Sequence, residues 1–246
     1  VSYADTAMVG SLGAWATASV TISNSPIMLI NGIIMSLGVG ITALVARAVG
    51  AGDPKMVQKL MRHAIMAIVA IGIPLSVLTI ALYRLIPMWM GADPEILDTA
   101  ATYNLIVSCG RIFMTTSMML NSAFRGYGDT KTPLIVNTMM NVVNVFFNFL
   151  LIYPTRVISL FGLEFTMWGA GLEVAGAAIA TSIGMTAAGL TTLWVAFFRK
   201  NEYQIHFRGS WKPDWALTRQ IFKISFPAML ERLFMSSSGI FVTRSI

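Results

Sequence analysis

The stretch FRGYGDTKTP, residues 124–133, places three charged residues and two glycines between long uncharged segments. The chain of 246 residues is 56% apolar and only 11% charged, and its mean hydropathy is +0.71. A soluble domain of this size needs a largely polar, charged surface, which this composition does not provide. The composition therefore predicts a membrane protein, and the quoted stretch predicts a polar turn between two membrane helices.

Uncharged apolar runs predict the membrane-spanning helices. A helix needs roughly 20 apolar residues to cross about 30 Å of hydrocarbon, and most of the runs reach that length. We expect the end of a first helix over 1–10, closed by the glycines of VGSLG. Complete helices are predicted over 20–46, 63–83, 99–123, 133–154 and 174–198, and a seventh begins near Ile221.

Basic residues are spread unevenly over the predicted connections. The connections at 47–62, 124–132 and 199–223 carry twelve Lys and Arg, whereas the other two carry two. Basic residues near helix ends are retained on the cytoplasmic side, so these three connections are predicted to be cytoplasmic. Because the basic residues fall between apolar runs rather than along one face, the net charge of +6 does not indicate a nucleic-acid partner.

The quoted stretch is thus predicted to be a short cytoplasmic turn. Glycines allow backbone angles that other residues rarely adopt, Asp or Thr caps a following helix, and proline suits its first turn. The turn motif comprises Arg125, Gly126, Gly128, Asp129, Thr130 and Pro133. An earlier stretch, RAVGAGDPK at 47–55, has similar ingredients. The sequence leaves open whether the two are a repeat or have converged for local reasons.

The RGYGDTKTP string, followed by NVVNVFFNFLLIY, resembles the multidrug and toxic compound extrusion (MATE) transporters. DTAMVGSLG, GVGITALVARAVGAGDPK and KISFPAMLERLFM extend the resemblance, in order, over the whole chain. The resemblance implies an all-α polytopic membrane bundle of twelve helices in two six-helix lobes around a central cavity. It places the N-terminal lobe at 1–198, a cytoplasmic linker at 199–220 and the start of the second lobe at 221–246. The rest of that lobe is expected on the same full-length chain.

Asp5 is the most informative single residue. A carboxylate in a membrane helix is costly unless it faces a wet cavity or a partner, so it is a functional candidate. The resemblance implies that it helps to bind the coupling cation, H+ or Na+. No other cofactor and no metal beyond a possible Na+ near Asp5 are implied. The alternative is that Asp5 lies near the interface and only caps a helix end.

Three asparagines, Asn141, Asn144 and Asn148, share one helix face at spacings of three and four. Amides in hydrocarbon are tolerated when they hydrogen-bond across helices. The resemblance places this stretch inside the lobe near Asp5, with Asn144 and Asn148 as further coupling residues and Asn141 as a possible cavity residue. Some MATE transporters have an acidic residue where Asn148 stands. Polar packing between helices is the alternative.

Other polar and flexible side chains are candidates for a cavity. Met114 and Met118 would suit a cavity that adapts to varied apolar compounds, and Glu231 could line its cytoplasmic half. Ordinary packing and an interfacial position explain these residues as well. Arg111 lies near the middle of a predicted helix, where a charge is costly. It is expected to pair with Asp5 or Glu231 or to extend towards the interface, and the sequence assigns it no role.

The resemblance implies a secondary antiporter of the cytoplasmic (inner or plasma) membrane that exports small organic, often cationic, compounds in exchange for H+ or Na+. The residues leave two alternatives, a flippase of lipid-linked sugars from the same superfamily and a non-transport membrane scaffold. The sequence shown has no GxxxxGK[ST] motif, so nothing in it indicates an ATP-driven pump. Charged residues are too sparse to suggest an enzyme.

The orientation is testable by labelling. In full-length protein that lacks Cys109, a cysteine introduced at Gly128 should not react with an impermeant thiol reagent in intact cells, because the turn faces the cytoplasm. It should react once the membrane is permeabilised. Equal labelling under the two conditions would reverse the topology.

Overall fold

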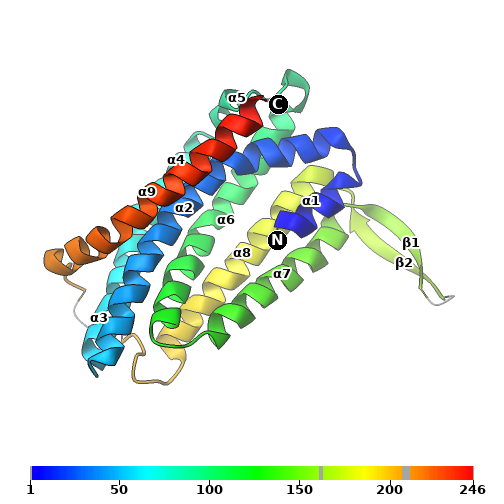
Figure 1. Ribbon diagram of the computed structural model, residues 1–246. Helices are drawn as coiled ribbons and strands as arrows, with labels where there is room; N and C mark the ends of the chain where they lie inside the picture. Colours follow the sequence, from blue (N-terminus) through cyan, green and yellow to red (C-terminus); the bar gives the residue numbers. More distant parts are fainter. Residues whose placement is uncertain (1, 161–162, 207–210, 246) are drawn as a thin grey trace.

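A computed structural model describes residues 2–160, 163–206 and 211–245, and it is a helical bundle with one β-hairpin (Figure 1). The first half of the chain contains α1 (Ser2–Gly10), α2 (Ala14–Gly50), α3 (Pro54–Ala67), the π-helix η1 (Ile68–Gly72), α4 (Ile73–Ala81) and α5 (Leu85–Trp89). The second half contains α6 (Pro94–Gly126), α7 (Lys131–Leu151), β1 (Pro154–Leu160), β2 (Leu163–Ala170), α8 (Glu173–Phe198) and α9 (Trp215–Ser245). The predicted all-α membrane fold class is confirmed, with the antiparallel β1–β2 hairpin as an unpredicted addition.

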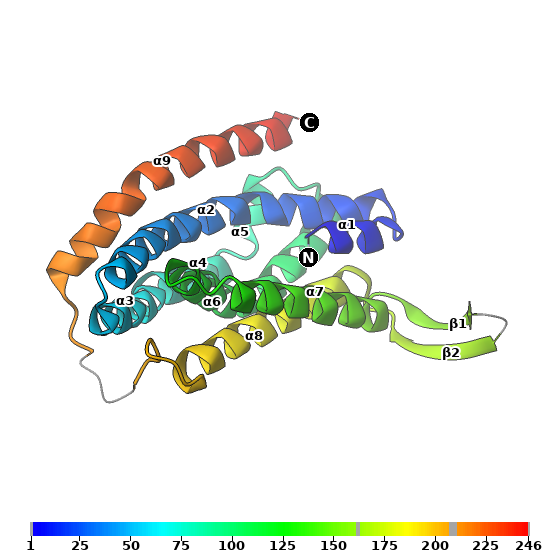
Figure 2. The same cartoon turned by 60° about the horizontal axis from the view of Figure 1, so that its bottom comes forward.

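Helix α6 lies at the centre of the bundle. It packs against α2 on one side and α8 on the other, and α7 packs on α8. Helix α9 runs along the outer side of α2, as Figures 1 and 2 show. The hairpin extends away from the bundle between α7 and α8, at the end opposite the α6–α7 turn (Figure 2). The main apolar core lies between α2, α3 and α6.

Four helical segments in the described part of the chain are long and apolar enough to cross a membrane: Ile30–Gly50, Pro54–Ala81, Lys131–Leu151 and Glu173–Phe198. Helix α6, predicted as a span over 99–123, does not meet this criterion. Its position explains the difference, because a helix enclosed by α2, α4 and α8 buries many Ser, Thr and Asn side chains against protein rather than lipid.

Several predicted helix boundaries are wrong, and side-chain caps explain two of them. Helix α3 begins at Pro54 instead of 63, because the Asp53 carboxylate accepts the Met56 N–H at 2.9 Å. Helix α9 begins at Trp215 instead of 221, because Asp214 accepts N–H groups from the next turn in the same way.

Two further boundaries reflect local breaks in helical geometry. The long span at 54–81 is divided near Pro74, which has no N–H to donate to the preceding turn. The π-helix η1, which ends at Gly72, accommodates this missing backbone hydrogen bond. Helix α7 ends at Leu151 rather than 154, where the β-branched and aromatic segments on either side of Phe161 and Gly162 form the two strands. The two residues of that junction lie outside the described ranges.

The turn at 124–131 ends one helix and begins the next. Gly128 has φ +88°, its N–H donates to the Arg125 carbonyl at 3.1 Å, and the Asp129 N–H donates to the Phe124 carbonyl at 2.9 Å. These bonds form a Schellman cap at the end of α6. The Asp129 carboxylate then accepts the Thr132 N–H at 2.9 Å and caps the start of α7. Asp129 therefore supplies the predicted cap.

Gly126 has a different role from the one the sequence suggests. It lies in the last turn of α6 with helical backbone angles, so positive φ is not the reason for glycine there. A Cβ at this position would lie 2.7 Å from Cβ of Val45 and 2.9 Å from the Thr42 carbonyl oxygen. Gly126 therefore permits the close approach of α6 to α2.

The earlier turn at 47–55 repeats the hydrogen-bond pattern. Gly52 has φ +66°, its N–H donates to the Val49 carbonyl at 2.9 Å, and the Asp53 N–H donates to the Ala48 carbonyl at 3.0 Å. The Asp53 carboxylate caps the following helix, as Asp129 does. The two stretches are therefore similar because they form the same kind of turn, with a glycine at positive φ and an aspartate that caps the next helix.

We expect the Gly128 turn to be sensitive to backbone conformation alone, because a Cβ there would meet nothing within 4 Å. Gly128→Ala should destabilise the protein by about 1–2 kcal/mol, the cost of placing an alanine in the left-handed region. Gly128→Asn should cost less, because asparagine tolerates that region. Thermal unfolding in detergent measures both variants, and equal losses of stability for Ala and Asn would contradict this explanation.

Candidate functional site

Three helices bring a buried polar cluster together around Asp5. From α7, Nδ2 of Asn148 donates to Oδ1 of Asp5 at 2.6 Å. From α8, the Thr181 hydroxyl donates to Oδ2 of Asp5 at 3.0 Å. Asn144 joins the cluster by donating to Thr181 Oγ1 at 3.2 Å. Both carboxylate oxygens of Asp5, which lies on α1, are thus hydrogen-bonded to other helices.

Small residues on α8 make this geometry possible. A Cβ at Gly184 would lie 3.1 Å from the Met140 carbonyl oxygen, and one at Gly176 would lie 2.4 Å from the Leu151 carbonyl oxygen. Helices α7 and α8 therefore approach closely on both sides of Thr181, and their short polar side chains reach one another.

The cluster is removed from solvent and from neutralising charge. Asp5 is 3% exposed, and Asn144 and Asn148 are fully buried. The ion pairs formed by the described residues are Lys59–Asp214, Arg84–Asp98 and Arg199–Asp129, so none of these pairs includes Asp5.

The oxygen atoms of the cluster suit a proton or a small hard cation. Asn148 Oδ1 is buried with no hydrogen-bond partner and lies in the same amide that binds Asp5. Carboxylate, amide and hydroxyl oxygens are the donors that hard cations prefer. Within the described ranges, no group of three or more His, Cys, Asp and Glu could hold a metal ion.

The structure separates the three predicted asparagines. Asn144 and Asn148 lie in the Asp5 cluster, whereas Asn141 is exposed and lies outside it. Thr181 was not identified from the sequence. Its signal is the small-residue segment around it, EVAGAAIATSIG at 173–184, which marks a helix face capable of close packing.

A second feature is a cavity of about 900 Å³ between α2, α6, α7 and α9. The predicted cavity residues Met114, Met118 and Glu231 all line it, and Glu231 is exposed at its wall. Asn121, which the sequence analysis did not single out, also lines it. This side chain is 3% exposed, donates to Ser117 at 3.0 Å and leaves its own Oδ1 without a partner.

Arg111 does not adopt any of its expected arrangements. It is 2% exposed, so it does not extend to the interface. It forms no ion pair with Asp5 or Glu231 within the described residues, and its Nε and Nη2 have no hydrogen-bond partner. The Asp5 oxygens accept hydrogen bonds from Asn148 and Thr181 instead.

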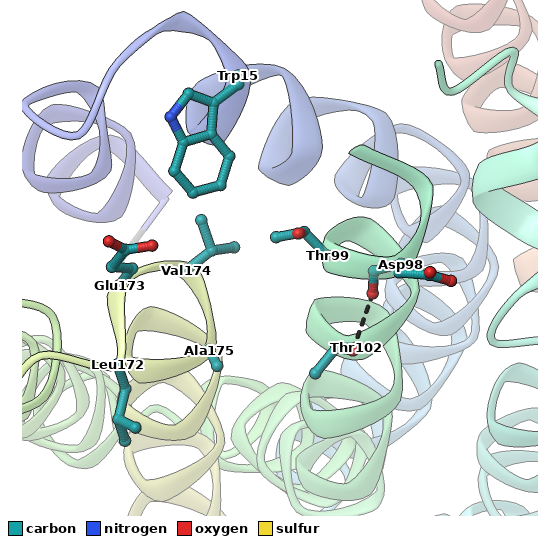
Figure 3. A pocket seen from close by; sticks show the side chains of 8 residues that line it. All are labelled: Trp15, Asp98, Thr99, Thr102, Leu172, Glu173, Val174 and Ala175. Carbon is teal, nitrogen blue, oxygen red and sulfur yellow. Dashed lines mark hydrogen bonds between the residues drawn. The ribbon is translucent and has the colours of Figure 1, made fainter. Parts of the chain in front are cut away.

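A smaller pocket of about 320 Å³ lies between the first turns of α2, α6 and α8 (Figure 3). Trp15 lies over it, with Glu173 and Val174 at its side. The Asp98 carboxylate points away from the pocket (Figure 3). It pairs with Arg84 at 2.9 Å. None of the residues predicted to be functional lines this pocket.

Polar contacts attach the end of α8 and the following connection to the predicted cytoplasmic turns. Arg199 donates to Asp129 at 2.6 Å and to Thr132 Oγ1 at 2.7 Å. Lys59 pairs with Asp214 at 2.5 Å. Partial burial opposes ionisation of Asp129, but the hydrogen bonds from Thr132 and the Arg199 guanidinium outweigh it, so the pKa of Asp129 lies below its ordinary value.

The bundle of apolar helices, the carboxylate buried within it and the separate cavity are features of one part of a helical membrane transporter. Residues 1–150 match the MatE family model. The chain therefore belongs to the MATE family of integral membrane transporters, which confirms the resemblance drawn from the turn motif.

Two relatives and one solved structure show the extent of the similarity. The chain is 29% identical over 244 residues to a probable multidrug resistance protein NorM of Thermotoga maritima, covering 99% of this chain and 49% of the relative. It is 26% identical over 205 residues to the multidrug export protein MepA of Staphylococcus haemolyticus, covering 83% and 42%.

An inward-facing multidrug resistance MATE family transporter shares the fold, with a TM-score of 0.83 at 24% identity over 98% of this chain and 51% of that one. The chain spans about half the length of the curated relatives it matches.

We expect Asp129→Ala to lower the free energy of unfolding at pH 7 by about 0.5–2 kcal/mol, the usual value of a helix N-cap. Because the folded pKa of Asp129 is depressed, its contribution is fully present above the ordinary value of about 3.9 and is lost as the pH falls through the folded pKa. The difference in stability between the parent and the variant should therefore shrink below about pH 4.

Denaturant unfolding in detergent at several pH values measures this difference. Arg199→Gln serves as a control, because it removes the ion pair and leaves the Thr132 N–H bond in place. A difference that persists unchanged at pH 3 would show that ionised Asp129 does not contribute in this way.

Proposed function

We propose that the chain provides the N-terminal lobe of a secondary antiporter that exports small organic, often cationic, compounds in exchange for H+ or Na+. The observation that carries this proposal is the Asp5 carboxylate, which is 3% exposed, hydrogen-bonded to α7 and α8, and in no ion pair with the described residues. No further cofactor is required. The proposed location is the cytoplasmic membrane, inner or plasma.

The coupling step follows from the donors and acceptors at Asp5. With the carboxylate ionised, Asn148 and Thr181 donate to its two oxygens. A proton on Asp5 would convert one acceptor into a donor. A Na+ ion would instead attract the oxygens of Asp5, Asn148 and Thr181. Either change alters the bonds that join α1 to α7 and α8, and so biases the lobe between two arrangements.

The substrate side of the proposal rests on the cavity and the relatives. Met114 and Met118 give its wall flexible, polarisable side chains that adapt to different apolar shapes. Glu231 adds a carboxylate that favours a cationic group. The relatives named for multidrug resistance and multidrug export support organic compounds as substrates. Their greater length supports a second lobe on the full-length chain.

Asp5→Asn should abolish gradient-driven export while preserving folding and membrane insertion, because the amide keeps the shape of the side chain and loses its negative charge. The measurement is export of a fluorescent cationic dye from vesicles under an imposed H+ or Na+ gradient, with parent and variant matched for protein amount. Applying the two gradients separately identifies the coupling ion.

Asp98→Asn is the matched control, because it changes an exposed carboxylate that is paired with Arg84. It should export at the parental rate. Undiminished, gradient-dependent export by Asp5→Asn would remove Asp5 from the coupling mechanism.

A further inference from the structure

The connection between α8 and α9 is held against the first turns of α3 at two places. Nε2 of Gln58 donates to the Glu202 carbonyl at 2.8 Å. Nζ of Lys59 binds the Asp214 carboxylate at 2.5 Å, and Nε2 of His63 accepts the Asp214 N–H at 3.0 Å. Asp214 is thus bound to α3 through both its side chain and its backbone.

Asp214 also determines where α9 begins. Its carboxylate accepts the N–H groups of Ala216 and Leu217 at 3.0 and 3.2 Å and so caps the first turn. The Leu217 side chain is buried in the main apolar core. Further along α9, the Ser225 hydroxyl donates to the Leu37 carbonyl of α2 at 3.4 Å. The direction of α9 is therefore fixed at Asp214 and along α2.

The hydrogen bonds of His63 fix the positions of its protons. A backbone N–H can only donate, so Nε2, which meets the Asp214 N–H, carries no proton. Nδ1 lies 2.9 Å from the Lys59 carbonyl, which can only accept, so Nδ1 carries the proton. The imidazole is therefore neutral in this arrangement. A second proton, placed on Nε2, would turn the acceptor into a donor that faces the Asp214 N–H.

The described groups around His63 leave a second proton without a free acceptor. The two acids of the connection beside α3, Asp214 and Glu202, are already bonded, to Lys59 and to Tyr203. The core around α3 presents apolar side chains from α2 and α6. At this end of the lobe the other charged residues of the neighbouring helices, apart from the cap Asp53, are basic: Arg47 on α2, Lys55 and Arg62 on α3, Arg125 on α6, and Arg219 and Lys223 on α9.

We propose that His63 is a positioning residue, which holds the start of α9 against α3 in its neutral form and releases it when a proton binds to Nε2. Histidine ordinarily changes charge between about pH 5 and 8. Asp214 stays ionised in that range, because Lys59 and the first N–H groups of α9 hold its pKa below the ordinary value. The inference goes beyond coupling at Asp5. It rests on the proposed function only in that α9 leads to the second lobe.

The test measures this junction in the full-length transporter in lipid nanodiscs, without an ion gradient or a substrate. In protein whose own cysteines, Cys109 included, are replaced, spin labels on Lys55→Cys and Gln220→Cys report the distance between α3 and α9, because both positions are exposed. The population with a longer distance should rise about threefold to tenfold between about pH 8 and about pH 5, which corresponds to the loss of one hydrogen bond. Identical distance distributions at the two pH values would overturn the proposal.

Three histidine variants identify the responding group. His63→Gln keeps an acceptor for the Asp214 N–H and cannot gain a proton, so its distances should match those of the parent at the higher pH and should not change on acidification. His63→Leu removes the acceptor and should give the longer distance at both pH values. His206→Gln is the matched control, because His206 is an exposed histidine of the same connection that bonds the Gln204 carbonyl.

His206→Gln should respond to pH like the parent. A response in His63→Gln as large as in the parent would show that another group binds the proton, and so would loss of the response in His206→Gln. The comparison of these two glutamine variants decides the proposal even where His63→Leu does not fold.

The same labels separate this inference from coupling at Asp5 and from the ion pair of Lys59. Asp5→Asn should retain the pH response even where gradient-driven export is lost, because Asp5 lies in a different cluster. Lys59→Gln should lengthen the distance at both pH values and retain the response, because the bond between the Asp214 N–H and His63 remains. Loss of the response in Asp5→Asn or in Lys59→Gln would assign the proton to Asp5 or to the Lys59–Asp214 pair and overturn the role of His63.

Discussion

Close contact between helix backbones is the constraint on which the bundle depends. Lipid tails are as apolar as leucine, so helices in a membrane associate through packing and hydrogen bonds rather than through burial of apolar surface from water. A Cβ at Gly126 or Gly189 would lie within 3 Å of a carbonyl oxygen on the neighbouring helix, that of Thr42 or Phe113. These contacts hold α6 against α2 and α8, and the polar site and the cavity follow from that arrangement.

Close packing provides hydrogen-bond partners for one buried charge, Asp5, and leaves part of another, Arg111, without them. At Asp5, three helices approach so closely that Asn148 and Thr181 bind both carboxylate oxygens. At Arg111, the neighbouring helices leave Nε and Nη2 without acceptors. A buried charge that is solvated by fixed dipoles is stable in place, whereas one without partners requires something from outside the described chain.

The sequence was most informative where one residue type has one physical explanation. Gly128 at positive φ and Asp129 as a helix cap were predictable, because few other residues meet those requirements. The need of Asp5 for polar partners was predictable because a carboxylate is costly in a membrane helix. Its hydroxyl partner Thr181 was not, because threonine is common in helices and only the close packing of α7 on α8 brings it to Asp5.

Tertiary context also explains features that the sequence did not reveal. Helix α6 is less apolar than a lipid-facing span, because its surroundings are protein on several sides. Asn141 matches Asn144 and Asn148 in spacing, but the spacing of three and four residues defines a broad face, and only Asn144 and Asn148 are buried. The hairpin replaced an expected loop, because a short β-rich segment has no helical periodicity to identify it.

Hydrogen bonds attach α1 to the rest of the lobe at two places, Asp5 and Tyr153. Four side-chain hydrogen bonds join α1 or the turn after it to α7, α8 and the residues that follow α7. Asn148 and Thr181 bind Asp5, and the Tyr153 hydroxyl bonds the Met8 carbonyl at 3.1 Å and Ser11 at 3.0 Å. The two bonds at Tyr153 do not depend on the charge of Asp5, whereas the two at Asp5 do. Under the proposed coupling, a proton or cation at Asp5 would change one attachment of α1 and leave the other in place, which would favour rotation or bending of α1 about its Tyr153 end over its complete release.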